Sequence, residues 1–205
     1  MVRTARYSEE HFIDAATALV AEGGPGAATM QAIARRVGAP TGSIYHRFES
    51  RSAILAAAWN ASYGSLAGVL VPLLQAGSPR EAALALLPWA EEDRQRARFL
   101  LQHEPVTLFE DAPPPERLRQ EMEKLESEMD GAFRTCIAQV GAGASPEEDL
   151  ARAKFLIFDA PIAIIRPHLL AKGAIPTFAG QMIAELHAAV PLAHAGKRGA
   201  GMRAA

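Results

Sequence analysis

The chain has 205 residues, of which 49% are hydrophobic and 21% charged, and its formal net charge at pH 7 is −2. This length is sufficient for one or two domains with a sizeable buried core. A single cysteine, Cys136, excludes an internal disulfide and fits a reducing cytoplasm. The longest apolar stretch recognised, 155–170, is interrupted by Asp159, Arg166 and His168, and the N-terminus lacks the apolar run of a signal peptide. We therefore expect a cytoplasmic protein without a membrane partner.

The composition favours helices. Ala, Leu, Glu and Arg are abundant, and Val and Ile do not alternate with polar residues for long enough to indicate a sheet. Ser8 is a suitable N-cap for a first helix that runs to about Glu22, where Gly and Pro residues at 23–26 end it. The sequence therefore predicts an all-α fold.

Residues 29–51 predict two short helices joined by a tight turn. Thr29 is a good N-cap for the first helix, which extends to about Val37. Gly38 supplies the turn, where a positive φ costs no Cβ clash. Pro40 suits the first turn of the second helix. Because Ile33, Ala34 and Val37 would face Ile44 and Phe48, the pattern is typical of a helix-turn-helix.

The opposite face of the second helix carries Gly42, Ser43, Tyr45 and His46, which are small or hydrogen-bonding residues. Gly42 should cost about 1 kcal/mol relative to Ala in a helix interior, which a close approach to a sugar–phosphate backbone would explain. A plain helical hairpin within a bundle is the alternative reading of this stretch.

The rest of the chain predicts further helices. Ser50 caps a long fourth helix to about Leu74, and Ser78 opens a fifth toward His103, which Pro88 should kink or divide. An irregular piece with Phe109 precedes a long helix from Pro115 to about Val140. The last two predicted helices run from Ser145 to about Ala171 and from Pro176 to about His194.

Several residues of the helix-turn-helix resemble the DNA-binding domain of the TetR family of one-component transcriptional regulators. The matching features are Thr29, Ile33-Ala34, Gly38, the Ile44-Tyr45-x-x-Phe48 run, Ser50 and a basic residue at 51, and the match covers roughly residues 6 to 58. Arg51 departs from the family, which most often has Lys there, and a planar guanidinium contacts phosphate differently from an ammonium group.

The resemblance implies an N-terminal three-helix DNA-binding domain at 1–49 and a helical ligand-binding and dimerisation domain at 50–194. The Gly, Ala, Lys and Arg residues of 195–205 predict a disordered tail. The resemblance also implies a homodimer that binds a palindromic DNA operator, with a small-molecule effector, largely apolar, that releases a repressor from DNA. No cofactor and no metal are implied. The expected groove-facing contacts are Gln31, Thr41, Ser43, His46 and Arg47; Gly42 permits close approach, and Thr29, Tyr45 and Arg51 are expected phosphate contacts.

The charge distribution is compatible with this reading. Residues 1–51 contain six Arg and five acidic residues, a net charge of +1, which leaves −3 for the remainder. The acids cluster on the first helix and the bases on the hairpin and N-terminal arm, so a modest basic face is expected. We expect DNA affinity to need two such domains together.

An effector pocket in the C-terminal domain is expected to be lined by aromatic and sulfur-containing residues and one histidine. The candidates are Trp59, Tyr63, Trp89, Phe99, His103, Phe109, Met122, Met129 and Phe133. Residues of this kind at helical spacing are also common in plain hydrophobic cores, so core packing is the alternative for each of them.

The helix at 155–170 is apolar nearly all round, so it must be buried on more than one side. A dimer partner would explain this, and so would a central core position. The expected interface residues are Phe155, Phe158, Asp159, Ile162, Ile165, Arg166, Met182 and Leu186. Asp159 and Arg166 need a partner or water, and could form a cross-dimer ion pair, contact a ligand or line a wet groove.

Catalytic signatures are missing from the sequence: it has no glycine-rich phosphate loop after a strand, no Cys/His pair at metal-ligand spacing and no nucleophile elbow. We therefore predict that the protein is not an enzyme. Two rivals stay open, namely a helical enzyme or ligand carrier that uses the aromatic-rich bundle as its cavity, and a helix-turn-helix protein controlled by a protein partner. Cys136 is read as an inert buried thiol, with redox sensing as the alternative.

Overall fold

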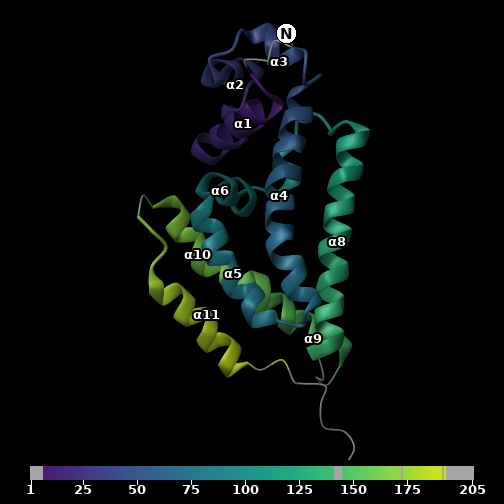
Figure 1. The fold of residues 1–205 in the computed structure, drawn as a ribbon, viewed down its shortest axis with the longest axis vertical. Coiled ribbons are helices and arrows are strands. Elements are labelled where there is room, and N and C mark those ends of the chain that lie inside the picture. Colours follow the sequence, from purple (N-terminus) through teal and green to yellow (C-terminus); the bar gives the residue numbers. More distant parts are fainter. Residues whose placement is uncertain (1–6, 141–144, 172, 191, 193–205) are drawn as a thin grey trace, which may run out of the picture. The chain divides into compact units, whose positions relative to one another are not determined.

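The computed structural model describes residues 7–140, 145–171, 173–190 and 192. These residues form eleven α-helices and two short segments of other helix types, with no strand among them (Figure 1). The predicted all-α fold is confirmed.

The first three helices form a compact group, as their ribbons show in Figure 1. Ser8 caps the first helix, because its Oγ accepts from the His11 amide (3.3 Å) while the Ser8 amide donates to His11 Nδ1 (3.2 Å). The elements are α1 (Glu9–Gly23), the 3₁₀ turn η1 (Pro25–Ala27), α2 (Met30–Val37) and α3 (Thr41–Tyr45). Pro40 is the N-cap of α3, which corrects its predicted place in the first turn.

The two longest of the described helices are α4 (Arg51–Gln75) and α8 (Glu116–Val140). The Ser50 hydroxyl accepts from the Ala53 amide (3.1 Å), so the predicted cap of α4 is confirmed. The contacts of the chain divide it into two compact units: the first contains 1–67 and 89–127, and the second contains 68–88 and 128–205. Both long helices contribute to both units.

The predicted fifth helix is divided at a position other than the one expected. The structure has α5 (Pro79–Glu92), with Pro88 inside it, and α6 (Arg94–Gln102). The break falls at Asp93, whose carboxylate accepts from the Arg96 amide (3.0 Å) and so caps the new helix. Of the predicted kink or division at Pro88, the division is wrong, because α5 continues through Pro88 and a new helix begins after the N-cap Asp93. The short helix α7 (Pro105–Leu108) lies in the piece that was expected to be irregular.

The C-terminal elements belong to the second unit. They are α9 (Pro146–Lys154), the π-helical segment η2 (Phe155–Asp159), α10 (Ala160–Leu170) and α11 (Thr177–Ala189). The predicted cap Ser145 is confirmed, since its hydroxyl accepts from the Glu148 amide (3.2 Å). The last helix ends at Ala189, earlier than predicted, and His194 lies outside the described residues.

One described helix, α4, is long and apolar enough to cross a membrane by length and composition alone. Its apolar run is diluted by small residues, so the sequence alone did not single it out. A buried core helix passes the same test, and 56% of the apolar window in α4 is buried inside the protein. We treat α4 as a core helix.

The division into two contact units does not follow the predicted functional boundary at residue 49, because the helix-turn-helix shares its unit with α6, α7 and part of α8. The functional domains at 1–49 and 50–194 therefore stay a prediction. The predicted disordered tail at 195–205 lies outside the described residues.

Candidate nucleic-acid interface

The helix-turn-helix is built from the caps and turn that the sequence predicted. Thr29 Oγ1 accepts from the Ala32 amide (3.1 Å) at the start of α2. Gly38 ends α2 in the left-handed conformation, with φ 74° and ψ 23°. The Gly38 carbonyl accepts a hydrogen bond from the hydroxyl of Tyr7 (2.8 Å), so the turn is also held by the residue before α1.

Apolar side chains hold α2 and α3 together. Ile33, Ala34 and Ile44 are fully buried, and Phe48, which follows α3, is 6% exposed. Val37 is half-buried rather than fully inside. The inward positions of both helices therefore match the predicted core, and the remaining side chains of α3 are left to face outward.

The exposed face of α3 carries Thr41, Gly42, Tyr45 and His46. The Tyr45 ring is 57% exposed, which is unusual for so large an aromatic residue. Gln31 on α2 is exposed as well, and Ser43 is half-buried. These side chains can donate and accept hydrogen bonds, as contacts with base edges and phosphates require. Their assignment as DNA contacts stays a prediction.

Gly42 lies near the start of α3, and not in the helix interior that the sequence predicted. It is the second residue of the five-residue α3, and a Cβ atom added there would meet nothing within 4 Å. The cost of glycine in a helix interior therefore does not apply in full, because this position lies in the first turn. The open space is compatible with close approach of another molecule.

Arg47 is turned toward its own domain. Its guanidinium donates to the Ser43 carbonyl through Nη1 (3.0 Å) and to the Tyr7 carbonyl through Nη2 (2.7 Å). It also lies over the Phe12 ring, 5.6 Å from the ring centre. This arrangement argues against the predicted groove contact. Sequence reasoning missed it because Tyr7 lies 40 residues away.

Arg51 is also used inside the protein. Its Nε donates to the Ala28 carbonyl (3.1 Å), its Nη2 to the Pro25 carbonyl (2.6 Å) and its Nη1 to the Asp111 carboxylate (2.9 Å). The side chain is 23% exposed. These partners argue against the predicted phosphate contact, and no local sequence pattern pointed to them.

The predicted basic face is weaker than the charge count suggested. Arg36 forms a bidentate ion pair with Glu22 (2.7 Å for both hydrogen bonds), which lowers the pKa of the Glu22 carboxyl and raises the pKa of Arg36. Together with Arg47 and Arg51, three of the six arginines of residues 1–51 thus have partners within the protein. Arg35 is exposed on α2, and Arg3 and Arg6 lie outside the described residues.

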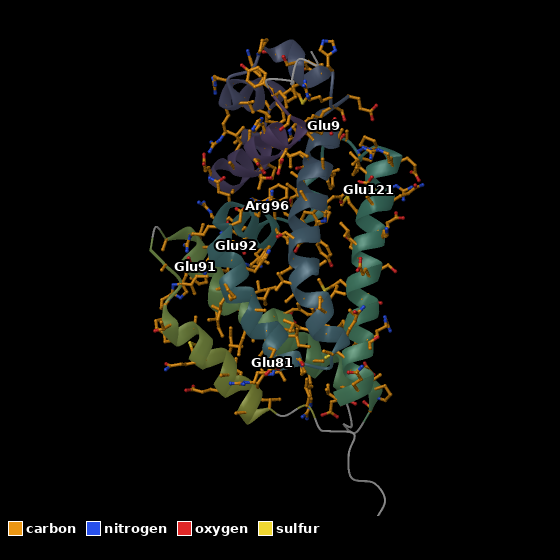
Figure 2. The ribbon with its side chains drawn as sticks, viewed as in Figure 1. Glu9, Glu81, Glu91, Glu92, Arg96 and Glu121 are labelled. Atoms are coloured by element: carbon orange, nitrogen blue, oxygen red, sulfur yellow. The ribbon has the colours of Figure 1, made fainter. Side chains whose placement is uncertain are left out.

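Helix α6 packs against α1 through polar contacts. Arg96, labelled in Figure 2, reaches from α6 to the Asp14 carboxylate (3.1 Å), and Gln95 donates to Glu22 (3.5 Å). His103, just after α6, has its pKa lowered chiefly by burial; a hydrogen bond to the Val20 carbonyl opposes this, and the nearby Arg98 charge adds to it. The helix-turn-helix domain formed by α1, α2 and α3, called the DNA reader below, therefore contacts α6 within the first unit.

The nine pocket candidates are divided between the two units. Met129 and Phe133 belong to the second unit and the other seven to the first. In the first unit, Trp59 stacks on Tyr63 (6.2 Å between ring centres) and lies 6.3 Å from Phe99. In the second, Phe133 meets Phe158 edge to face at 5.4 Å. The assignment of these residues to an effector pocket stays a prediction, with core packing as the alternative for each of them.

Two polar groups of the first unit's aromatic cluster differ in how they are satisfied. Trp89 Nε1 donates to Ser65 Oγ (3.1 Å). Trp59 is 6% exposed, and its Nε1 is buried without a hydrogen-bond partner. Open grooves of about 430 and 320 Å³ occur near Tyr7 and near Arg47, and none of the nine candidates lines either groove.

The residues predicted to form the dimer interface differ in how deeply they are buried within the single chain. Ile165 is fully buried within its own chain, so its assignment to an interface is wrong; an all-round apolar helix does not reveal which side its own core covers. Phe158 packs on Phe133. Asp159 approaches Lys154 (3.7 Å between Oδ2 and Nζ) in an exposed pair within the chain, and an ion pair across a dimer stays a prediction for Asp159 and Arg166.

An apolar surface nevertheless remains open on this unit. Phe155 is 47% exposed and Met182 is 44% exposed, and both were predicted. Leu170 (63%) and Phe178 (49%) were missed, because the sequence alone did not show which side of each helix the core occupies. Arg166 is exposed, and Ile162 and Leu186 are half-buried.

Cys136 is fully buried, and burial raises the pKa of its thiol to about 11. The reactive thiolate is therefore disfavoured, which supports the inert reading of this cysteine. The described residues contain no group of three or more His, Cys, Asp or Glu side chains that could hold a metal ion.

Residues 12–58 match the family model described as bacterial regulatory proteins, tetR family. No curated protein matches the sequence. A transcriptional regulator from Rhodococcus sp. Rha1 is similar in structure, with 17% identity, a TM-score of 0.67 and coverage of 90% of this chain and 96% of that one.

Two further solved structures are similar. The TetR family transcriptional regulator PfmR from Thermus thermophilus has 16% identity, a TM-score of 0.62 and coverage of 94% of this chain and 99% of that one. The superantigen pfit has 17% identity, a TM-score of 0.61 and coverage of 90% and 89%. At such identities a structural likeness shows the fold alone, so function rests on the helix-turn-helix. The family match runs from α1 into the start of α4, so residues 12–58 form a DNA-binding domain of the TetR type, and the chain as a whole shares its fold with these regulators.

Proposed function

We propose that the protein is a cytoplasmic homodimeric repressor, which binds a palindromic operator through α3 and leaves it when a small molecule binds. The observation that carries this proposal is the exposed face of α3, where Tyr45 and His46 stand out from a buried Ile44 and Phe48. Two such helices in a dimer would enter successive major grooves, about 34–36 Å apart. The groove contacts of the proposal are Gln31, Thr41, Ser43 and His46; Gly42 gives close approach, and Thr29 and Tyr45 contact phosphates.

The apolar surface of η2, α10 and α11 supports the homodimer. Phe155, Phe178 and Met182 are each more than two-fifths exposed in the single chain. A stable dimer buries about 800 Å² per partner, and large apolar side chains at its centre supply most of the energy. A second copy of the same surface would cover these residues, with Asp159, Ile162, Arg166 and Leu186 around them.

The aromatic cluster of the first unit supports an effector that is largely apolar. Trp59, Tyr63 and Phe99 offer stacking surfaces, and the buried Nε1 of Trp59 would be satisfied by an acceptor atom on the effector. The remaining lining candidates of this unit are Trp89, His103, Phe109 and Met122. Residues Met129 and Phe133 are left to core packing.

The packing of α6 on α1 supports release from DNA. Phe99 and Arg96 lie on the same helix, so a shift of α6 on effector binding would pull on Asp14 and on the reader that α1 supports. Effector and DNA would then oppose each other by a coupling free energy of about 1–3 kcal/mol.

The experiment that tests the proposal is selection of preferred duplexes from a random pool by the purified protein at moderate salt. We expect an enriched palindrome with half-sites about one helical turn apart, lost in Tyr45→Ala and kept in Val106→Ala. Val106 is 72% exposed on α7 and serves as the matched control. Binding without enrichment, which fades as salt rises, would contradict sequence-specific reading.

A further inference from the structure

We propose that Arg51 is a positioning residue of the DNA reader, which fastens the α1–α2 connection to the first turn of α4 and does not contact DNA phosphate. The contact role that the resemblance implies for the basic residue at this position is thus replaced in this chain by a structural one. The expected effect on DNA binding rests on the function proposed above. The expected effect on thermal stability does not depend on that function.

The geometry of the guanidinium carries the proposal. Nε and Nη2 form one edge of the planar group, and they donate to the carbonyls of Ala28 (3.1 Å) and Pro25 (2.6 Å). Both carbonyls lie in the connection between α1 and α2, and Ala28 is fully buried. The next residue, Thr29, caps α2. Arg51 therefore fixes the start of α2 relative to α4, and through α2 it fixes the turn that places α3.

The remaining edge of the guanidinium is covered by a carboxylate. Nη1 donates to Asp111 (2.9 Å), which lies between α7 and α8 and whose side chain is 80% exposed. A phosphate could reach this edge only by displacing Asp111, and the other edge is already occupied by two carbonyls. An arginine used in this way has little left to offer to DNA.

Lysine would not replace this arrangement. An ammonium group is a single point of charge on a flexible stem, whereas the guanidinium presents donors in a fixed plane to three acceptors at once. The lysine that is common in the family would keep the charge needed for a phosphate contact and lose the fastening. Arg51→Lys therefore separates the two roles.

The ion pair with Asp111 is expected to matter less than the two carbonyls. An exposed pair of this kind contributes little to stability, because water screens it. The carbonyl of the fully buried Ala28 would be left without the donor that Arg51 supplies, which is costly, whereas the Pro25 carbonyl would keep its hydrogen bond from the Ala28 amide (3.2 Å). Asp111→Asn thus serves as a variant that disturbs only the exposed edge.

The experiment compares Arg51→Lys, Arg51→Met and Asp111→Asn in the full chain, with Arg35→Met as the matched control. Arg35 is an exposed arginine of the same domain. Thermal unfolding is followed by circular dichroism, and binding of a fluorescent duplex taken from the selection is followed by anisotropy at several salt concentrations. The slope of log affinity against log salt counts phosphate contacts, at roughly 0.9 per contact.

We expect Arg51→Lys and Arg51→Met to lower the unfolding midpoint by roughly 4–8 °C and to weaken DNA binding about tenfold at every salt concentration, with the slope unchanged. Asp111→Asn and Arg35→Met should leave the midpoint within about 2 °C. Should Arg51→Met fail to fold, Arg51→Lys decides alone.

A wild-type midpoint and wild-type affinity in Arg51→Lys would overturn the proposal, as would a shallower salt slope in Arg51→Met. If the wild-type protein selects no duplex, the function proposed above fails, and the unfolding midpoints still decide whether Arg51 fastens the connection.

Discussion

The single chain leaves two surfaces uncovered, and their chemistry differs. The face of α3 exposes Thr41, Tyr45 and the following His46, which can form hydrogen bonds. The surface of η2, α10 and α11 exposes Phe155, Phe178 and Met182, which are apolar. Water tolerates the first surface and disfavours a contiguous patch of the second. The partners proposed for the two surfaces differ accordingly, with DNA for the polar face of α3 and a second copy of the chain for the apolar surface of η2, α10 and α11.

The sharpest contrast is between two neighbours on α3. Ile44→Ala should destabilise the protein by about 2–4 kcal/mol, because Ile44 is fully buried between the two helices of the motif. Tyr45→Ala should change the stability by less than about 0.5 kcal/mol, because Tyr45 faces outward. Urea unfolding of both variants measures this. Equal losses would show that the outward face of α3 is part of the core.

The apolar surface can be broken without touching the reader. Met182→Glu should weaken self-association by about 100-fold, because it places a charge where an apolar partner surface is expected. Sedimentation velocity over a concentration series gives the dissociation constant. Val106→Glu, on the exposed α7 of the other unit, is the matched control and should leave the association unchanged. Unaltered association in Met182→Glu would remove this surface from the interface.

The polar surface can be separated into positioning and reading residues. His46→Ala should cost about 1–3 kcal/mol against the preferred duplex and relax the choice of base at one position of each half-site. Tyr45→Phe should weaken binding to all duplexes alike, by up to about tenfold, because a phosphate contact carries no sequence information. Repeating the duplex selection with each variant measures both effects. An unchanged preferred operator in His46→Ala would refute the base contact.

The smallest expected effect concerns pH. Burial lowers the pKa of His103 in the folded state, so the unfolded chain binds a proton more readily. The stability that this contributes is fully present above the ordinary pKa of about 6.5 and is lost as the pH falls from there through the lowered value.

His187 on α11 behaves in the same direction, because burial lowers its pKa as well. His103→Asn should therefore flatten the loss of stability between about pH 6.5 and 5 without removing it. Urea unfolding at a series of pH values measures this. An identical pH profile in the variant would show that His103 does not titrate differently on folding.

Features that depend on neighbouring residues were predictable from the sequence. The caps Ser8, Thr29, Ser50 and Ser145 each accept a hydrogen bond from an amide three residues ahead. Gly38 provides a positive φ at the turn. Such contacts lie within one turn of chain, so residue type and spacing are sufficient to predict them.

Features that depend on distant residues were not predictable. The partners of Arg51 lie 23, 26 and 60 residues away, and one partner of Arg47 lies 40 residues away. Nothing in the local sequence distinguishes an arginine that reaches DNA from one that satisfies carbonyls of its own chain. For the same reason the all-round apolar helix did not reveal that Ile165 faces the core.

One error arose between two local signals of the same helix, a proline and a capping aspartate. Pro88 was expected to interrupt its helix, and Asp93 did so instead. Proline removes one amide donor and strains one turn, which a helix packed on its neighbours tolerates, whereas a capping carboxylate supplies a bond that begins a new helix.

The π-helical segment η2 takes up one extra residue between α9 and α10. At its end the amide of Ala160 donates to the carbonyl of Phe155, five residues back, so this turn holds one residue more than an α-helical turn. Loss of a single codon within Phe155–Asp159 would close it to an ordinary α-helical turn and leave the face that α10 presents nearly unchanged. Loss of a codon within α10 has no wide turn to absorb it and would rotate the residues beyond the deletion by about 100°. The chain therefore tolerates a change of length at η2 that it would not tolerate one turn later.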